Sequence, residues 1–167
     1  TTIWGEQTPD NLAVAMLATP ADSHARTPAA RPAPAFELPT LEDSVSLESL
    51  RGHPVLVDFW ASWCGPCRKS FPWMNTLEKQ YGPKGLAIVA INVDKERRLA
   101  DAFLRELPPD FTVAFDPSGK TAAAYGVGAM PTSFLIDADG NVIAKHAGFD
   151  PRRVEEMETR IQEALAR

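Results

Sequence analysis

The chain has 167 residues, enough for one well-buried domain and too few for two of ordinary size. Its hydrophobic fraction of 44% is typical of a soluble globular protein, and its net charge of −5 argues against a dedicated nucleic-acid binder, which needs a basic face. No apolar run approaches the roughly 20 residues that a membrane-spanning helix needs. The first residue is Thr, so the start of the chain does not reveal whether a signal or membrane anchor has been removed.

Only two cysteines are present, Cys64 and Cys67. A disulfide scaffold would use more cysteines at wider spacing, and a closed structural zinc site needs four ligands. The three histidines, His24, His53 and His146, are scattered without ligand spacing. We therefore expect no metal and no cofactor. His146, near the end of a predicted strand, is expected to be exposed and inert.

Residues 1–34 differ from the rest in composition. The stretch from Thr19 to Pro34 consists mainly of Ala, Pro, Ser, Thr and Arg. Such a stretch buries too little apolar surface to offset the entropy of ordering the chain. We expect an N-terminal extension and linker over 1–34, with a short helix at about 11–18, and one compact domain over 35–167.

Strands and helices alternate along the predicted domain. Short apolar runs predict strands, and apolar residues at helical spacing predict helices. In chain order we expect a strand at 54–60, a helix from Cys67 to Tyr81, a strand at 86–93, a helix marked by Leu99, Phe103 and Leu107, a strand at 111–115, a helical turn at 120–125, strands at 132–136 and 142–147, and a last helix opened by Asp150 and Pro151. Residues 137–141 are typical of a hairpin turn, so the last two strands should pair antiparallel. This order predicts an α/β fold with a mixed central sheet flanked by helices on both faces.

The two cysteines fall at the start of the first predicted helix. Residues i and i+3 of a helix lie about 5–6 Å apart, a distance that suits a disulfide. At a helix start, unpaired N–H groups and the positive end of the helix dipole favour thiolate over thiol. We therefore predict that Cys64 is the nucleophile and Cys67 the more buried resolving thiol. The alternative is a static bridge or two inert thiols.

The run from Val57 to Cys67 resembles the active-site segment of thioredoxins. Three further segments, at 34–39, 50–52 and 126–132, are similar to the TlpA/ResA-like branch of bacterial extracytoplasmic thioredoxin-like proteins. The resemblance covers residues 34–167. It implies a thioredoxin fold and a thiol–disulfide oxidoreductase.

The resemblance also implies an insertion and a further segment that contacts substrate. The 63 residues between Cys67 and Pro131 leave room for an extra helix and strand, at about 95–115, that minimal thioredoxins lack. A trans proline opening a strand is the ordinary case, but the resemblance implies a cis bond before Pro131, which would turn the backbone of Met130 toward a substrate peptide. Besides Met130, three residues of the cysteine motif are expected to contact substrate: Trp63, Gly65 and Pro66.

Asp58 interrupts an otherwise apolar predicted strand. A buried carboxylate is costly and should have a raised pKa, whereas an Asp on the solvent side of the strand would not. The resemblance to thioredoxins implies that Asp58 accepts and returns the proton of Cys67. The TlpA/ResA-like branch commonly carries Glu three residues after the second cysteine, where this chain has Ser70. Either Asp58 alone transfers the proton, or the pKa values at the active site are set differently in this chain than in the TlpA/ResA-like branch.

The leading functional hypothesis is reduction of disulfides in extracytoplasmic client proteins, through a mixed disulfide on Cys64. The Gly65-Pro66 pair resembles reducing rather than oxidising members of the family. The expected partners are client proteins with disulfides and a membrane or soluble thiol donor, and the protein is expected to be a periplasmic or extracytoplasmic monomer. Membrane anchoring before processing is left open. The alternatives are an oxidase or isomerase, a dithiol copper-handling chaperone, and a module that only binds a partner beside Pro131.

Overall fold

The computed structural model describes residues 31–167. A five-stranded sheet with the strand order β5-β4-β3-β6-β7 forms its centre. Its strands are β3 (Val55–Trp60), β4 (Ala87–Asn92), β5 (Thr112–Phe115), β6 (Thr132–Ile136) and β7 (Val142–Ala147). Neighbours pair in parallel from β3 to β5, whereas β6 pairs antiparallel with both β3 and β7. The predicted α/β class with a mixed sheet is confirmed.

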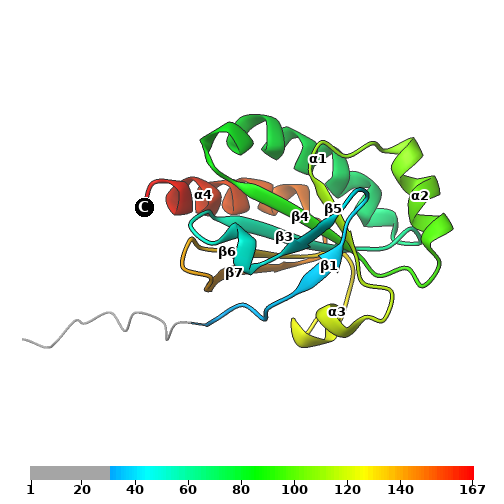
Figure 1. Ribbon diagram of the computed structural model, residues 1–167. Coiled ribbons are helices and arrows are strands. Elements are labelled where there is room, and N and C mark those ends of the chain that lie inside the picture. The colour runs from blue at the N-terminus through cyan, green and yellow to red at the C-terminus, as the bar shows by residue number, and fades with distance from the viewer. Residues whose placement is uncertain (1–30) are drawn as a thin grey trace, which may run out of the picture.

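Helices cover both faces of this sheet (Figure 1). They are α1 (Gly65–Tyr81), α2 (Arg97–Glu106), α3 (Lys120–Ala124) and α4 (Val154–Leu165), with short 3₁₀ turns η1 (Glu48–Leu50), η2 (Gly82–Lys84) and η3 (Pro151–Arg153). Figure 1 shows α1 and α4 on one face and α3 on the other. The predicted insertion between Cys67 and Pro131 contains α2 and β5, as expected.

The central strand β3 leads directly into the cysteine motif. It is buried at all six of its positions. Its side chains alternate between two hydrophobic clusters, one on each face of the sheet. Trp60 packs in the cluster under α1 and α2, with its ring centroid 4.7 Å from that of Phe71 and 4.6 Å from that of Phe103. Phe59 packs in the opposite cluster, 5.3 Å from the ring of Tyr125. Trp60 is therefore a packing residue.

A small antiparallel sheet of β1 (Glu37–Pro39) and β2 (Ser44–Ser46) precedes the core and was not predicted. Strands of three residues are too short to show an alternating pattern. Part of the expected linker is also ordered against the domain. The N–H of Val142 donates to the carbonyl of Arg31 at 2.8 Å, and that of Ala33 to the carbonyl of Gly140 at 2.9 Å. The remainder of the linker and the helix expected at about 11–18 lie outside the described residues.

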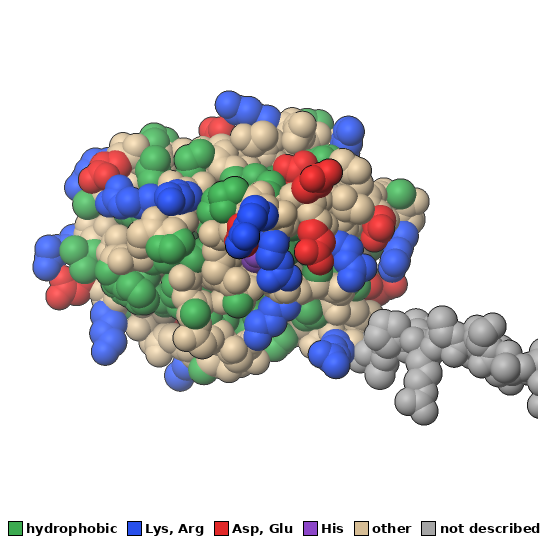
Figure 2. Space-filling model, turned by 180° about the vertical axis from the view of Figure 1, so that it is seen from behind, with side chains coloured by type: hydrophobic (Ala, Val, Ile, Leu, Met, Phe, Trp, Pro, Cys, Tyr) green, Lys and Arg blue, Asp and Glu red, His purple; other side chains and the backbone are tan. Residues whose placement is uncertain are grey.

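The surface of the domain carries charges of both signs. Figure 2 shows Lys and Arg side chains interspersed with Asp and Glu, with hydrophobic groups between them. Several of these charges are paired across short distances, such as Arg68 with Glu106 at 2.6 Å and Arg97 with Asp101 at 3.0 Å. None of the helices described combines the length and the hydrophobicity that crossing a bilayer requires.

Candidate active site

Cys64 and Cys67 form a disulfide at the point where the chain leaves β3 and enters α1, with their Cα atoms 5.3 Å apart. Cys64 is the N-cap of α1 and has extended backbone angles. The backbone N–H of Cys67 donates to Cys64 Sγ at 3.3 Å, which satisfies one of the free donors of the helix start. Pro66 occupies the first turn, where a missing N–H costs nothing. The predicted helix-start position of Cys64 is confirmed.

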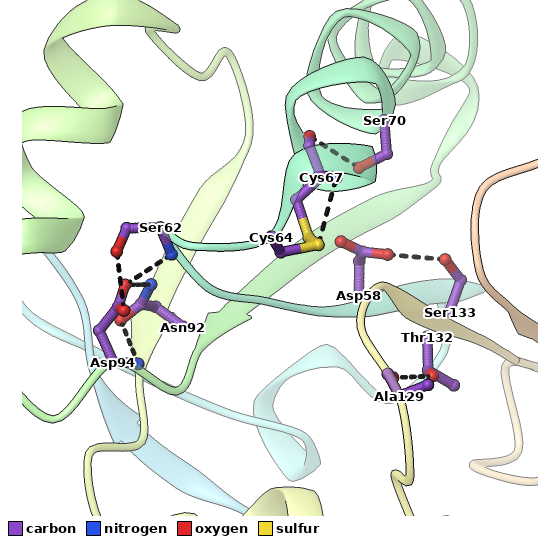
Figure 3. Close-up of a disulfide and its surroundings, with 10 residues drawn as sticks. All are labelled: Asp58, Ser62, Cys64, Cys67, Ser70, Asn92, Asp94, Ala129, Thr132 and Ser133. Atoms are coloured by element: carbon purple, nitrogen blue, oxygen red, sulfur yellow. Dashed lines mark hydrogen bonds between the residues drawn. A yellow bond between two sulfur atoms is a disulfide. The ribbon is translucent and has the colours of Figure 1, made fainter.

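Asp58 lies in β3 with its carboxyl group fully buried. Its Oδ1 accepts a hydrogen bond of 2.7 Å from the hydroxyl of Ser133 on β6. Its Oδ2 is buried without a hydrogen-bond partner among residues 31–167 and points toward the cysteine pair in Figure 3. Burial raises the pKa of Asp58 to about 7, although the hydrogen bond from Ser133 opposes the rise. The predicted buried carboxyl group with a raised pKa is confirmed, and the solvent-facing alternative is wrong.

Ser70, where a Glu was expected from the resemblance, faces the interior. It is buried, and its hydroxyl donates to the carbonyl of Cys67 at 3.0 Å (Figure 3). A hydroxyl with a pKa far above neutrality does not act as a proton acceptor in the way a carboxylate does. Asp58 is therefore the carboxyl group that the structure places beside the cysteines.

The rim of the site is exposed although the sulfur atoms are not. Trp63 is 71% exposed, and Gly65 and Pro66 are also exposed, whereas Cys64 is only 4% and Cys67 0% exposed. An exposed apolar indole therefore stands next in the chain to a nearly buried sulfur. The roles of these three rim residues in substrate binding remain predictions.

The segment before β6 closes another side of the site. The Met130–Pro131 peptide bond is cis, as predicted, and Pro131 is buried while Met130 is half-buried. The hydroxyl of Thr132 donates to the carbonyl of Ala129 at 2.6 Å and fixes this turn (Figure 3). The contact of Met130 with substrate remains a prediction.

A polar cluster that the sequence analysis missed holds the loop before Cys64. Asp94 is buried and accepts hydrogen bonds of 2.9 Å from both the backbone N–H and the hydroxyl of Ser62. The side-chain amide of Asn92 donates to the same carboxylate at 2.8 Å (Figure 3). The signal was an Asn that ends a buried strand and an Asp two residues after it, next to the C-terminal end of β3. These residues position the cysteine loop and do not touch the sulfur atoms.

The expected exposure of His146 was wrong. His146 is half-buried, and it lines a small cavity together with Pro131 and Ser133. It is less exposed than expected because the turn at Gly148–Asp150 and the start of α4 pack beside β7 and line the same cavity. Within the described part of the chain, no three His, Cys, Asp or Glu side chains come together as a metal site would require.

Comparisons with known proteins agree with this geometry. The model of the Redoxin family matches residues 28–161. The chain belongs to the Redoxin family.

Individual relatives indicate which kind of enzyme this family member is. The chain is 40% identical over 117 residues to the thiol-disulfide oxidoreductase ResA of Bacillus cereus, covering 70% of this chain and 68% of that protein. It resembles the crystal structure of a putative thiol:disulfide interchange protein DsbE from Chlorobium tepidum, with a TM-score of 0.80 and 50% identity over 81% of this chain and 96% of that chain. A putative thioredoxin from Neisseria meningitidis matches with a TM-score of 0.69 and 26% identity, over 83% of this chain and 95% of that one. The predicted family, thioredoxin fold and enzyme class are confirmed: this Redoxin-family protein is a thiol–disulfide oxidoreductase.

Proposed function

We propose that this protein reduces disulfides in extracytoplasmic client proteins through a mixed disulfide on Cys64 that Cys67 resolves. One observation carries the proposal: the cysteine pair caps α1 directly over a buried carboxyl group whose pKa is raised to about 7. The first cysteine is stabilised as a thiolate by the helix start. The second has a base that can take its proton near neutral pH.

The reaction has two exchange steps. The Cys64 thiolate attacks one sulfur of the client disulfide, and the other client sulfur leaves as a thiolate and takes a proton from solvent. Asp58 then accepts the proton of Cys67, whose thiolate attacks Cys64 Sγ. The second client thiolate leaves and is protonated, so the client gains two electrons and two protons while the cysteines form the disulfide seen in the structure.

The surroundings of the cysteines support a client of polypeptide size. Met130 is half-buried next to Pro131, and we propose that its backbone pairs with an extended client segment. The exposed indole of Trp63, next to Cys64 in the chain, offers a further apolar contact. The surface that a client first meets is formed by Trp63, Gly65 and Pro66.

The cellular setting of the proposal comes from the relatives. Similarity to the ResA and DsbE proteins supports a periplasmic or extracytoplasmic location. In such an oxidising compartment the cysteines return to the dithiol only if a membrane or soluble thiol donor supplies electrons. We propose that the protein works as a monomer between that donor and its clients.

Reduction of insulin by the full chain, with dithiothreitol as donor, tests the proposal. We expect turnover by the wild-type protein and none by Cys64→Ser. With Cys67→Ser the first step proceeds and the second cannot, so a covalent client adduct on Cys64 should accumulate and be visible by mass spectrometry. Faster oxidation of a reduced client than reduction of insulin would instead identify an oxidase. Binding of insulin without any turnover would identify a module that only binds.

A further inference from the structure

Three side chains on neighbouring strands lie in one row across the sheet. Asp58 on β3 is the register partner of Ser133 on β6, and Ser133 is the register partner of His146 on β7. Residues directly opposite on paired strands point to the same face, with Cβ atoms about 4.5–5.5 Å apart. Leu56 and Leu135, two residues from the row along their strands, pack in the cluster that includes α1 and α4. The row therefore lies on the face that these helices cover.

Ser133 connects Asp58 to a small cavity. Its hydroxyl donates to Asp58 Oδ1 at 2.7 Å, and both residues are buried (Figure 3). Ser133, His146 and Trp73 line a cavity of about 10 Å³, close to the free volume that one water molecule needs. The indole N–H of Trp73 is buried and has no hydrogen-bond partner among residues 31–167. Ser133 and His146 are polar partners that this cavity, otherwise lined mainly by apolar side chains, offers a water molecule.

His146 reaches from this cavity to the surface. The same imidazole lines the small cavity and an open pocket between β7 and α4. The charged groups that surround it come from its own strand, from the turn before α4 and from α4: Lys145, Asp150, Arg153, Glu156 and Arg160. Burial, and after it the charge of Arg153, lower the pKa of His146, while the carboxylates of Glu156 and Asp150 oppose them. The lowered pKa favours the neutral imidazole, which can accept a proton.

We propose that Ser133, a water molecule in this cavity and His146 form the path by which the proton taken up by Asp58 leaves for solvent. The inference rests on the proposed function, in which that proton comes from Cys67. In the structure the Ser133 hydroxyl donates to Asp58 Oδ1. Once Asp58 is protonated, its O–H turns toward Ser133 and the Ser133 hydroxyl turns toward the water, so that Ser133 Oγ accepts the proton of Asp58 while its own proton passes to the water. The water passes a proton to His146, which releases it to solvent, and the Ser133 hydroxyl then turns back toward Asp58. No electrons move along the path.

Replacing His146 tests the path in the full chain. Reduced protein is mixed with insulin at pH 7, the reaction is stopped with acid, and the decay of the mixed disulfide is followed by mass spectrometry over successive turnovers with dithiothreitol. We expect His146→Ala to slow client release on the order of three- to tenfold, less than the roughly 10² to 10⁴ of a group that transfers the reacting proton directly. Imidazole in the buffer should restore most of the rate, because it can enter the space left by the side chain.

Two further variants separate proton transfer from structure. His146→Gln fills the space with an amide that does not titrate, so it should be slow and gain little from imidazole. His53→Ala removes an exposed histidine and should react like wild type in both buffers. Wild-type rates for His146→Ala, or slow rates that imidazole does not restore, would overturn the path.

The same assay distinguishes a failure of the proton path from a failure of the proposed function. If Asp58→Asn slows client release while His146→Ala does not, the path is wrong and the role of Asp58 stands. If the wild-type protein forms no mixed disulfide with insulin, the proposed function is wrong, and the path is wrong with it.

Discussion

The backbone N–H of Cys67 donates a hydrogen bond of 3.3 Å to Cys64 Sγ. Cys64 thereby serves as the N-cap of α1 through its sulfur, a place usually taken by an oxygen. A sulfur held at this position is stabilised in its negative form by the donor and by the helix dipole. Cys67, one turn farther along and 0% exposed, has the unfavourable desolvation of a buried thiol instead.

The difference between the two thiols predicts selective alkylation. In the reduced protein at neutral pH, iodoacetamide should label Cys64 well before Cys67, because only a thiolate within reach of solvent reacts. Peptide mapping after brief exposure measures the ratio, and the denatured protein, in which both thiols react alike, is the control. Equal labelling of the folded protein at both positions would contradict the assignment of Cys64 as nucleophile.

The carboxyl group of Asp58 predicts a pH-dependent resolution step. With its pKa raised to about 7 by burial, Asp58 is protonated in acid and cannot accept the proton of Cys67. Client release by the wild type should therefore speed up as the pH rises through about 7. Asp58→Asn should lose this rise and be slower near neutral pH, on the order of 10²-fold if Asp58 acts as a full general base.

A matched variant isolates this effect. Asp139→Asn removes an exposed carboxylate in the β6–β7 turn and should keep the wild-type profile. Mixed-disulfide decay measured from pH 6 to 9 compares the three proteins. An unchanged profile for Asp58→Asn across that range would mean that the carboxyl group takes no part.

Burial of Asp58 also predicts how stability varies with pH. Its pKa rises from 3.8 to about 7 on folding, so between these pH values the folded state binds a proton that the unfolded state has lost. The free energy of unfolding should therefore fall as the pH rises from about 4 to about 7 and level off above that range. The loss is about 4 kcal/mol, at about 1.4 kcal/mol for each tenfold change in the ionisation equilibrium.

Urea unfolding of the oxidised protein at several pH values measures this loss. Asp58→Asn should lack it, so the difference in stability between variant and wild type should grow in favour of the variant between pH 4 and pH 8. Using the change with pH removes any constant cost of the amide itself. A difference that does not depend on pH would show that Asp58 titrates normally in the folded protein.

The sequence predicted the chemistry of the site better than its surroundings. Cys64 and Cys67 could be placed because their spacing and the strand before them define a helix start, and Asp58 because a charged residue breaks an apolar run. The position of His146 could not be inferred. Its place beside Ser133 depends on the register between β6 and β7, and a shift of one residue would turn it to the other face.

The unpredicted elements share a physical reason. The β1–β2 hairpin has strands of three residues, each stabilised by pairing with the other and not by a pattern of its own. The contact of Asp94 with Ser62 joins residues that are 32 positions apart and meet only because β3 and β4 are parallel neighbours. Local sequence patterns carry no information on such pairings.

The last prediction concerns the direction of electron flow. A disulfide is strongly oxidising when the protein stabilises the reduced thiolate far more than the bridge. Gly65 and Pro66 bring no charged group or side-chain donor toward Cys64, and Arg68, the next cation along α1, is paired with Glu106 at 2.6 Å. The ionised form of Asp58 would oppose a thiolate above it. The helix start is left as the main source of stabilisation, and we expect a reduction potential on the order of −230 to −280 mV, nearer that of thioredoxin than that of DsbA.

Equilibration with glutathione buffers at pH 7, followed by acid trapping and alkylation, measures this potential. Asp58→Asn should have a less negative potential than wild type, since the variant removes a charge that disfavours the reduced thiolate, whereas Asp139→Asn should match wild type. These two outcomes together would tie the potential to the carboxyl group under the cysteines. A wild-type value of about −120 to −160 mV, close to DsbA, would mean that the reduced form is stabilised by something other than the helix start. The protein would then act as an oxidant of its clients, and the proposed direction of electron flow would be reversed.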